Sequence, residues 1–464
     1  MNGEQSCALS LPLPEDIQKR KWAGDLTGAA EAITRRLKKN LPKDLRDRLE
    51  LELEILKRLP TQYPYNKAQA LAVMRESIGD FTEEELDALD LDGCVDWIYT
   101  DAGKRYFVRF HMTLLKTPAL ALRAGNPVTP DSEWLDPLIE RIINEGELTA
   151  HIVARAELRV SDDAFIPGET YRAHLPIPAD APQTRDIHLV FPGFKPRMTG
   201  GQDDPQRTAF FEETLTENAA FTCQYRFTQI ARYADIMGLP PAEALYPGAP
   251  PPEPCDLAEE GACFRFTPYL KELCRDVTLG CPTPTDKVRA IYDFVTMHVT
   301  YAFVRDYLQI PDLAEYAAVN LRGDCGIQAI LFIALCRIAG IPARWQSGAV
   351  IAKGFIGSHD WAQFYLEGWG WLFADCSFGG SAYRSGNEIR RLFYLGNLEP
   401  LRLVFNRACQ KPLTPDKRFP RIDPYDNQTG EIECGAKGFN GRETDGDITL
   451  VQLRYDGLDG EDAG

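Results

Sequence analysis

Residues 325–339, CGIQAILFIALCRIA, constrain the fold of this chain more than any other segment. They are good helix formers and almost all apolar, so the helix they predict is buried on nearly every side. Asp324 can cap the first turn of this helix, and Gly340 followed by Pro342 ends it. The segment therefore predicts the centre of a compact region of mixed helix and sheet.

Cys325 is the first residue of this helix. The unpaired N–H groups and the positive end of the helix dipole stabilise a thiolate at that position, and the thiolate is the nucleophilic form of cysteine. Cys336 follows about 16 Å further along the helix axis, which is too far for a disulfide with Cys325. We therefore interpret Cys325 as a candidate nucleophile and Cys336 as a core thiol.

A histidine and an aspartate follow at a spacing that can complete a catalytic group. The segment 358–375, SHDWAQFYLEGWGWLFAD, predicts two aromatic-rich strands joined by a turn. A three-residue loop at 366–368 places His359 opposite Asp375, whereas a two-residue loop shifts its partner to Cys376. Since cross-strand Cβ atoms lie about 4.5–5.5 Å apart, this hairpin alone can couple the imidazole to the carboxylate.

These residues resemble the transglutaminase-like core. The resemblance rests on Gly-Asp-Cys-Gly, on the apolar helix that leads into Gly-Ile-Pro-Ala-Arg, and on His-x-Trp followed by Gly-Trp-x-Trp-x-x-x-Asp. It covers roughly residues 262–378 and implies a papain-like fold that needs no cofactor. By this resemblance Cys325 is the nucleophile, His359 the general base and acid, and Asp375 the orienting carboxylate. Gln363 departs from the family pattern, since many members carry an acidic residue there.

Three more residues are candidate contacts for the substrate or for an oxyanion, namely Tyr301, Asn320 and Trp361. Tyr301 and Asn320 are the plausible side-chain donors to an oxyanion, although a role in packing or in a turn is the stronger interpretation of each. Trp361 is interpreted as core or pocket wall. The main-chain N–H of Cys325 is the safer oxyanion donor.

The whole chain predicts a multidomain α+β protein. Helical periodicity dominates the start, short strands separated by turn residues follow, and a segment very rich in proline precedes the core. The expected parts are a helical domain (1–125), a β-sandwich (146–237), a Pro-rich linker (238–257), the transglutaminase-like catalytic domain (258–405) and a C-terminal extension (406–464) with a final strand at 448–455.

Composition limits the partners and the compartment. The net charge of −17 and the pI of about 5.0 argue against binding to nucleic acid or to an anionic membrane. No apolar run reaches the ~18 residues of a membrane span, and no secretory signal is visible, so we expect a cytoplasmic protein. The twelve cysteines lack a zinc-binding spacing, and we expect most of them to be free thiols, with no metal bound. The oligomeric state stays open.

The function that these residues predict is hydrolysis of a peptide or protein amide through a thioester on cysteine. A protein-crosslinking transglutaminase, which is an acyltransferase, uses the same residues, and the motif does not separate the two. The lack of a calcium-loop spacing and of paired C-terminal β-barrels favours the hydrolase or peptidase. A third alternative is a non-catalytic binding or scaffold protein with a relic core. The intact Cys325, His359 and Asp375 argue against it.

Overall fold

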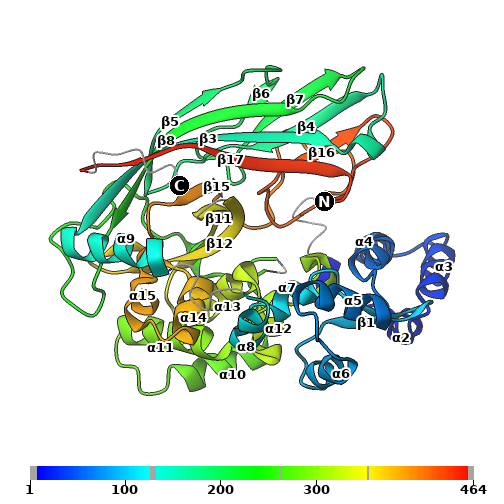
Figure 1. The fold of residues 1–464 in the computed structure, drawn as a ribbon, viewed down its shortest axis with the longest axis horizontal. Coiled ribbons are helices and arrows are strands. Elements are labelled where there is room, and N and C mark those ends of the chain that lie inside the picture. The colour runs from blue at the N-terminus through cyan, green and yellow to red at the C-terminus, as the bar shows by residue number, and fades with distance from the viewer. Residues whose placement is uncertain (1–7, 126–131, 262, 353–354, 458–464) are drawn as a thin grey trace.

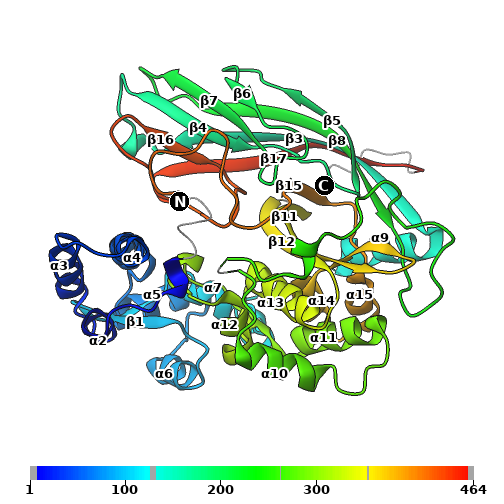
Figure 2. The same ribbon diagram turned by 180° about the vertical axis from the view of Figure 1, so that it is seen from behind.

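The protein combines two β-sheets, a sheet covered by helices, and a group of N-terminal helices (Figures 1 and 2). The structure is a computed structural model, and it describes residues 8–125, 132–261, 263–352 and 355–457. The predicted α+β class is confirmed. Within these residues no helix is both long enough and apolar enough to cross a membrane.

The N-terminal part is helical, as its periodicity predicted. Asn66 and Thr82 each cap a helix through a reciprocal capping box with the residue three positions on, Gln69 and Glu85. One hairpin, β1 (Trp97–Thr100) with β2 (Gly103–Tyr106), interrupts the helices. The helices are α2 (Glu15–Trp22), α3 (Leu26–Leu37), α4 (Lys43–Gln62), α5 (Lys67–Ser77), α6 (Glu83–Leu91), α7 (Phe110–Leu114), α8 (Pro118–Arg123) and α9 (Ser132–Glu145), with the 3₁₀ turn η1 (Ala8–Ser10) before them.

Two four-stranded sheets share one hydrophobic core and form the predicted sandwich. Strand β3 alternates buried residues with more exposed ones along its whole length, so one face of its sheet lies in the core. Strands β4 and β16 of the other sheet are buried on both faces over most of their length. The first sheet has the order β17-β3-β8-β5 and the second has the order β16-β4-β7-β6. The strands are β3 (Glu147–Val160), β4 (Thr170–Pro176), β5 (Thr184–Val190), β6 (Met198–Thr199), β7 (Thr208–Thr214), β8 (Phe221–Arg232), β16 (Glu431–Cys434) and β17 (Thr444–Tyr455). The 3₁₀ turn η2 (Asp162–Ala164) joins β3 to β4.

The last segment of the chain completes this sandwich. We expected residues 406–464 to be an extension beyond the catalytic domain, but β16 pairs with β4 and β17 pairs with β3 along most of its length. Figure 1 shows β17, in red, lying across the sandwich beside β3. Such pairing between distant segments leaves no local signal in the sequence, which predicted only a strand at its end.

The third part is a five-stranded sheet with helices on one side. Its strand order is β14-β13-β12-β11-β15. Leu403 and Phe405 of β15 and Ile351 of β11 belong to the core of the sandwich, so the two parts are packed together. The strands are β11 (Ala343–Ala352), β12 (Phe355–Leu366), β13 (Gly370–Ala374), β14 (Leu395–Gly396) and β15 (Arg402–Asn406). The helices are α10 (Pro268–Val277), α11 (Pro284–His298), α12 (Leu313–Asn320), α13 (Cys325–Ile338), α14 (Cys376–Arg384) and α15 (Glu388–Phe393).

The N-terminal helices contact the segment that leads into α13. The N–H of Phe303 donates to Thr113 Oγ1, and the N–H of Asp306 donates to the side chain of Gln62. Arg322 donates to the carbonyl oxygens of Gly93 and Cys94. Since residues from both parts also share one hydrophobic core, the N-terminal helices are packed onto the part of the chain that contains α13 and are not a separate tethered unit.

The proline-rich segment is also held against the core. It contains no helix or strand before the 3₁₀ turn η3 (Pro254–Leu257), but Trp371 Nε1 donates to the Pro250 carbonyl and Leu245 N to the Trp369 carbonyl. Nearby, Cys263 and Cys409 are joined by a disulfide, which the expectation of mostly free thiols did not identify. Nine of the described cysteines are free.

Candidate active site

The start of α13 is built as the sequence predicted. Asp324 caps the helix by accepting a hydrogen bond from Ile327 N at 3.1 Å, and the Tyr307 hydroxyl donates to the same oxygen at 2.5 Å. The preceding residues pair as β10 (Arg322–Gly323) with β9 (Thr300–Tyr301), in parallel. The chain can turn from α12 into β10 because Leu321 adopts a left-handed conformation with φ 49°.

His359 and Asp375 form a direct, buried contact. His359 Nε2 lies 2.7 Å from Asp375 Oδ2, and neither side chain is more than a few per cent exposed. Arg402, fully buried on β15, donates to the same carboxylate oxygen at 2.8 Å. The other oxygen of Asp375 accepts from Ser377 Oγ and Phe378 N, both at 3.0 Å, and thereby caps α14. The carboxylate is therefore fixed by four donors.

The register of the hairpin differs from both predicted ones. Leu366 pairs with Gly370 and Ala362 with Ala374, so the loop is 367–369 and Trp361 is level with Asp375. Gly370 has a φ of +81°, a conformation that favours glycine, and this turn moves the register. His359 stays on the same face as Asp375 because it lies two residues from Trp361, within reach of a diagonal contact. The predicted coupling is present, although the predicted pairing was wrong.

Opposing effects act on the pKa of Asp375. Burial raises the pKa of a carboxyl group, but the charges of His359 and Arg402 together outweigh burial and hold the Asp375 pKa well below its ordinary value. A carboxylate of this kind stays ionised and keeps a proton on the His359 nitrogen that faces it. Nδ1 is then the ring nitrogen left to exchange a proton with a thiol.

Cys325 lies at the start of α13, partly buried, and its sulfur contacts β12 at the residue after His359. Its thiol donates to Asp360 Oδ2 at 3.2 Å. Within the described part of the chain no hydrogen bond joins Cys325 to His359. Burial raises the pKa of the Cys325 thiol, and the charges of Asp360 and Asp324 raise it further. The helix start predicted a stabilised thiolate, and this expectation was wrong because burial of the thiol, followed by the charges of Asp360 and Asp324, outweighs the helix dipole.

The other predicted contacts lie in different surroundings. Tyr301 is near Cys325, since burial and then the charges of Cys325 and Asp324 raise its pKa. Asn320 is exposed and donates to the Tyr316 carbonyl, which is an ordinary contact at a helix end. Trp361 is buried, donates to Gln346 Oε1 at 2.7 Å and stacks near the ring of His359.

Gln363, the departure from the family pattern, accepts a hydrogen bond from Arg344 Nε at 2.8 Å. The guanidinium of Arg344 also lies over the ring of Trp371, at 3.8 Å from its centroid. Gln363 therefore orients an arginine on the sheet surface and makes no described contact with Cys325 or His359.

Sequence reasoning missed four residues of this region: Asp360, Arg402, Asp426 and Gln428. Asp360 stands within the motif His-Asp-Trp and was not assigned a role. Gln428 Nε2 donates to Asp360 Oδ1 at 2.7 Å and to the His359 carbonyl at 3.1 Å. Arg402, Asp426 and Gln428 come from segments outside the motifs, and no spacing in the sequence links these three residues to the site.

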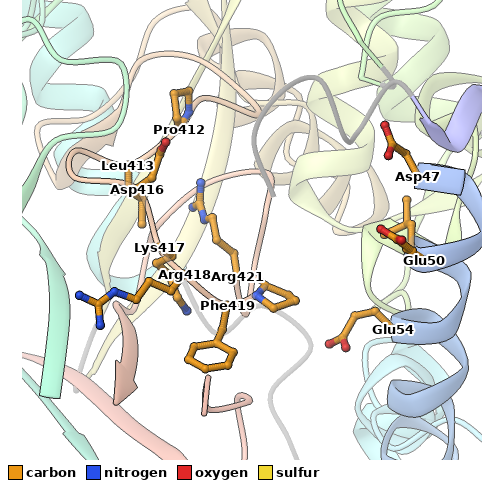
Figure 3. A pocket seen from close by; sticks show the side chains of 12 residues that line it. Asp47, Glu50, Glu54, Pro412, Leu413, Asp416, Lys417, Arg418, Phe419 and Arg421 are labelled. Carbon is orange, nitrogen blue, oxygen red and sulfur yellow. The ribbon is translucent and has the colours of Figure 1, made fainter. Parts of the chain in front are cut away.

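A separate cleft of about 360 Å³ lies between α4 and the C-terminal segment (Figure 3). Its walls are of opposite charge, with acidic side chains on α4 and basic ones on the facing loop: Asp47, Glu50, Glu54, Lys417, Arg418 and Arg421. Because neither Cys325 nor His359 lines it, we do not place the chemistry there. In the described part of the chain, no group of three or more His, Cys, Asp or Glu is placed to hold a metal ion.

Comparison with known families gives the class of this core. Residues 271–376 match the model of the transglutaminase-like superfamily. The predicted resemblance to the transglutaminase-like core is therefore confirmed for this part of the chain. No curated protein matches the sequence.

Solved structures give weaker similarity. A candidate cysteine protease from Cytophaga hutchinsonii aligns over 68% of this chain and 92% of its own, with 15% identity and a TM-score of 0.38. The periplasmic domain of TgpA from Pseudomonas aeruginosa aligns over 55% of this chain and 95% of its own, with 15% identity and a TM-score of 0.29. TM-scores this low carry no argument about this chain, so the resemblance rests on the family match over residues 271–376.

Proposed function

We propose that this protein is a cysteine-dependent amide hydrolase or peptidase that acts by acyl transfer through a thioester on Cys325. The observation that carries the proposal is the buried contact of 2.7 Å between His359 Nε2 and Asp375 Oδ2. His359 lies on β12, and the next residue of that strand, Asp360, contacts the Cys325 thiol. Such a pair fixes the tautomer of an imidazole and stabilises the imidazolium that forms during catalysis. A merely structural histidine has no need of a buried carboxylate and a buried arginine behind it.

The proposed reaction starts when Cys325 gives its proton to His359 Nδ1, and the electron pair of the S–H bond stays on sulfur. The thiolate attacks the carbonyl carbon of an amide, and the displaced electron pair of the C=O bond resides on oxygen. When this electron pair re-forms the C=O bond, the C–N bond breaks, and His359 donates its proton to the leaving amine. Water then hydrolyses the thioester, with His359 again accepting and returning a proton.

Residues around the thiol serve the other parts of this reaction. The main-chain N–H of Cys325, at the start of α13, is the proposed donor to the oxyanion. Direct contact with His359 requires the thiol to leave Asp360, and a rotation about the Cα–Cβ bond of Cys325 moves the sulfur between staggered positions. The reaction needs no metal and no organic cofactor.

Incubation with a mixed peptide library, a primary-amine tracer and casein tests the proposal. We expect new peptide amines or released ammonia, and we expect Cys325→Ala and His359→Asn to abolish both. Cys336→Ala is the matched control, because Cys336 is a buried thiol in the same helix and should be dispensable for turnover. Tracer incorporation that depends on Cys325 and outpaces hydrolysis would assign a crosslinking transglutaminase instead. Wild-type rates in Cys325→Ala would refute both.

A further inference from the structure

Carboxyl groups from separate segments of the chain meet at the thiol of Cys325. Asp360 of β12 accepts from Cys325 Sγ at 3.2 Å through Oδ2 and from Gln428 Nε2 at 2.7 Å through Oδ1. Asp360 and Asp426 also hydrogen-bond to each other. Ser347 Oγ donates to Asp426 Oδ2 at 2.5 Å, and Asn406 Nδ2 donates to Ser347 in turn. The proposed nucleophile therefore contacts one end of an ordered polar network.

Asp360 and Asp426 act as a pair. Two carboxyl groups hydrogen-bond to each other only when one of them carries a proton, because two adjacent carboxylates repel. Both side chains are buried, and burial raises the pKa of each, with the charge of Asp426 raising the Asp360 pKa further. The pair accordingly holds one proton and one negative charge beside the thiol.

The cation beside the pair is Arg421, which lowers the pKa of Asp426 and donates to its main-chain carbonyl, so it favours the negative charge of the pair. Other charged and titratable groups face the thiol. Burial raises the pKa of Asp324 to about 6, and burial likewise raises the pKa of Tyr307, which donates to Asp324. Arg109, at the start of α7, lowers the pKa of both Asp324 and Tyr301 and is the cation on that side. His359 points to Asp375 on the same strand. Asp360 alone among these groups hydrogen-bonds the sulfur of Cys325 in the described part of the chain.

The geometry points to Asp360 as a further catalytic residue, which binds the thiol proton of Cys325 in the resting enzyme, with Asp426 and Gln428 as its positioning residues. This inference rests on the proposed function of Cys325 as the nucleophile. In the resting enzyme the S–H bond is intact and its hydrogen points to Asp360 Oδ2. The S–H bond breaks when His359 Nδ1 takes the proton, which leaves a negative charge on sulfur and a positive charge on the imidazole. Because the negative charge of the pair favours the thiol over the thiolate, Asp360 sets how much thiolate is present before substrate binds.

The C-terminal segment takes part in this network through Asp426 and Gln428. Asp426 and Gln428 lie between β15 and β16, outside the part of the chain that matches the family model. They nevertheless reach the two residues of β12 nearest the nucleophile, since Gln428 contacts both Asp360 and the His359 carbonyl. The active site therefore includes the segment that returns the chain to the sandwich.

Opposite effects of two neighbouring substitutions test the inference. The rate of alkylation of Cys325 by iodoacetamide is measured between pH 5 and 10 by peptide mass spectrometry, with the exposed thiol Cys255 as internal reference. Asp360→Asn places a neutral amide beside the sulfur and leaves the charge of the pair on Asp426, which does not hydrogen-bond the thiol. The alkylation profile should therefore shift down by about one pH unit, which gives about tenfold faster labelling at neutral pH. Asp426→Asn leaves the negative charge on Asp360 alone, so labelling of Cys325 should become slower.

A merely structural role predicts a different pattern. If the substitutions only loosened the site, both Asn variants would label Cys325 faster, and that result would overturn the inference, as would an unchanged profile in Asp360→Asn. Asp256→Asn, at a buried aspartate in η3, is the matched control and should leave the profile unchanged. Turnover of peptides by the wild-type chain tests the proposed function separately. Opposite shifts without any turnover would uphold the proton contact and refute the hydrolase.

Discussion

At the scale of single residues, Asp375 is where the buried polar contacts of the site converge. It accepts from His359, Arg402, Ser377 and Phe378, and the histidine and arginine charges hold its pKa low despite burial. An isolated buried carboxylate is costly, but one with four donors, two of them charged, is stabilised where it lies. Substitution of Asp375 can therefore separate the effect of imidazole orientation on turnover from the reactivity of the Cys325 thiol.

Asp375→Asn should lower turnover by about 10²- to 10⁴-fold while Cys325 still reacts with iodoacetamide, because the amide disturbs the tautomer of His359 and leaves the thiol in place. Steady-state kinetics on the best substrate of the peptide library measures the loss, and circular dichroism verifies the fold. Ser377→Ala removes only one neutral donor to the same carboxylate and is the milder control. Full activity in Asp375→Asn would show that the carboxylate is structural.

At the scale of elements, the first turn of α13 approaches β12 and η4 (Tyr307–Gln309) so closely that only glycine fits at position 326. A Cβ atom there would lie 2.3 Å from the Tyr307 hydroxyl and 3.0 Å from Asp360 Oδ2. Gly326→Ala should therefore push both side chains away from the thiol and lower the free energy of unfolding by about 1–3 kcal/mol. It should also shift the alkylation profile of Cys325.

Denaturant unfolding and the alkylation profile together check this prediction. Gly79→Ala is the matched control, because a Cβ at Gly79 meets no atom within 4 Å, and it should stay within about 0.5 kcal/mol of wild type. If Gly326→Ala were as stable as Gly79→Ala and labelled like wild type, the close approach of the two elements would not matter for the site.

The same elements show how far the sequence could predict the structure. The cap at Asp324 and the helix from Cys325 followed from local preferences, and the structure has both. The hairpin of β12 and β13 was also predictable, but its register was not, because the turn could be placed in more than one way around its glycines. His359 lies two residues from the position level with Asp375, and residues two apart on a strand point to the same face of the sheet, so His359 still contacts Asp375. The contacts of Asp360 with Asp426 and Gln428 depend on distant segments and left no signal.

At the scale of the whole molecule, the C-terminal segment connects the parts of the protein. It leaves the five-stranded sheet at β15, contacts Asp360 through Gln428, and then adds one strand to each sheet of the sandwich. The disulfide from Cys409 to Cys263 joins its beginning to the core. A boundary at residue 405 therefore divides the site as well as the fold.

The last prediction concerns β17, which forms the edge of its sheet and pairs with β3 from Thr444 to Tyr455. A chain that ends at Glu443 leaves β3, a 14-residue strand, as an open edge with unpaired N–H and C=O groups. Long open edges pair with other chains, so the truncated protein should elute from size-exclusion chromatography as aggregates, although it retains every residue of the proposed site. Val451→Thr is the control: Val451 is exposed at the β-bulge, and its substitution should leave the full chain unaggregated. A truncated chain that stays monodisperse and unfolds at the wild-type urea concentration would show that β17 is dispensable.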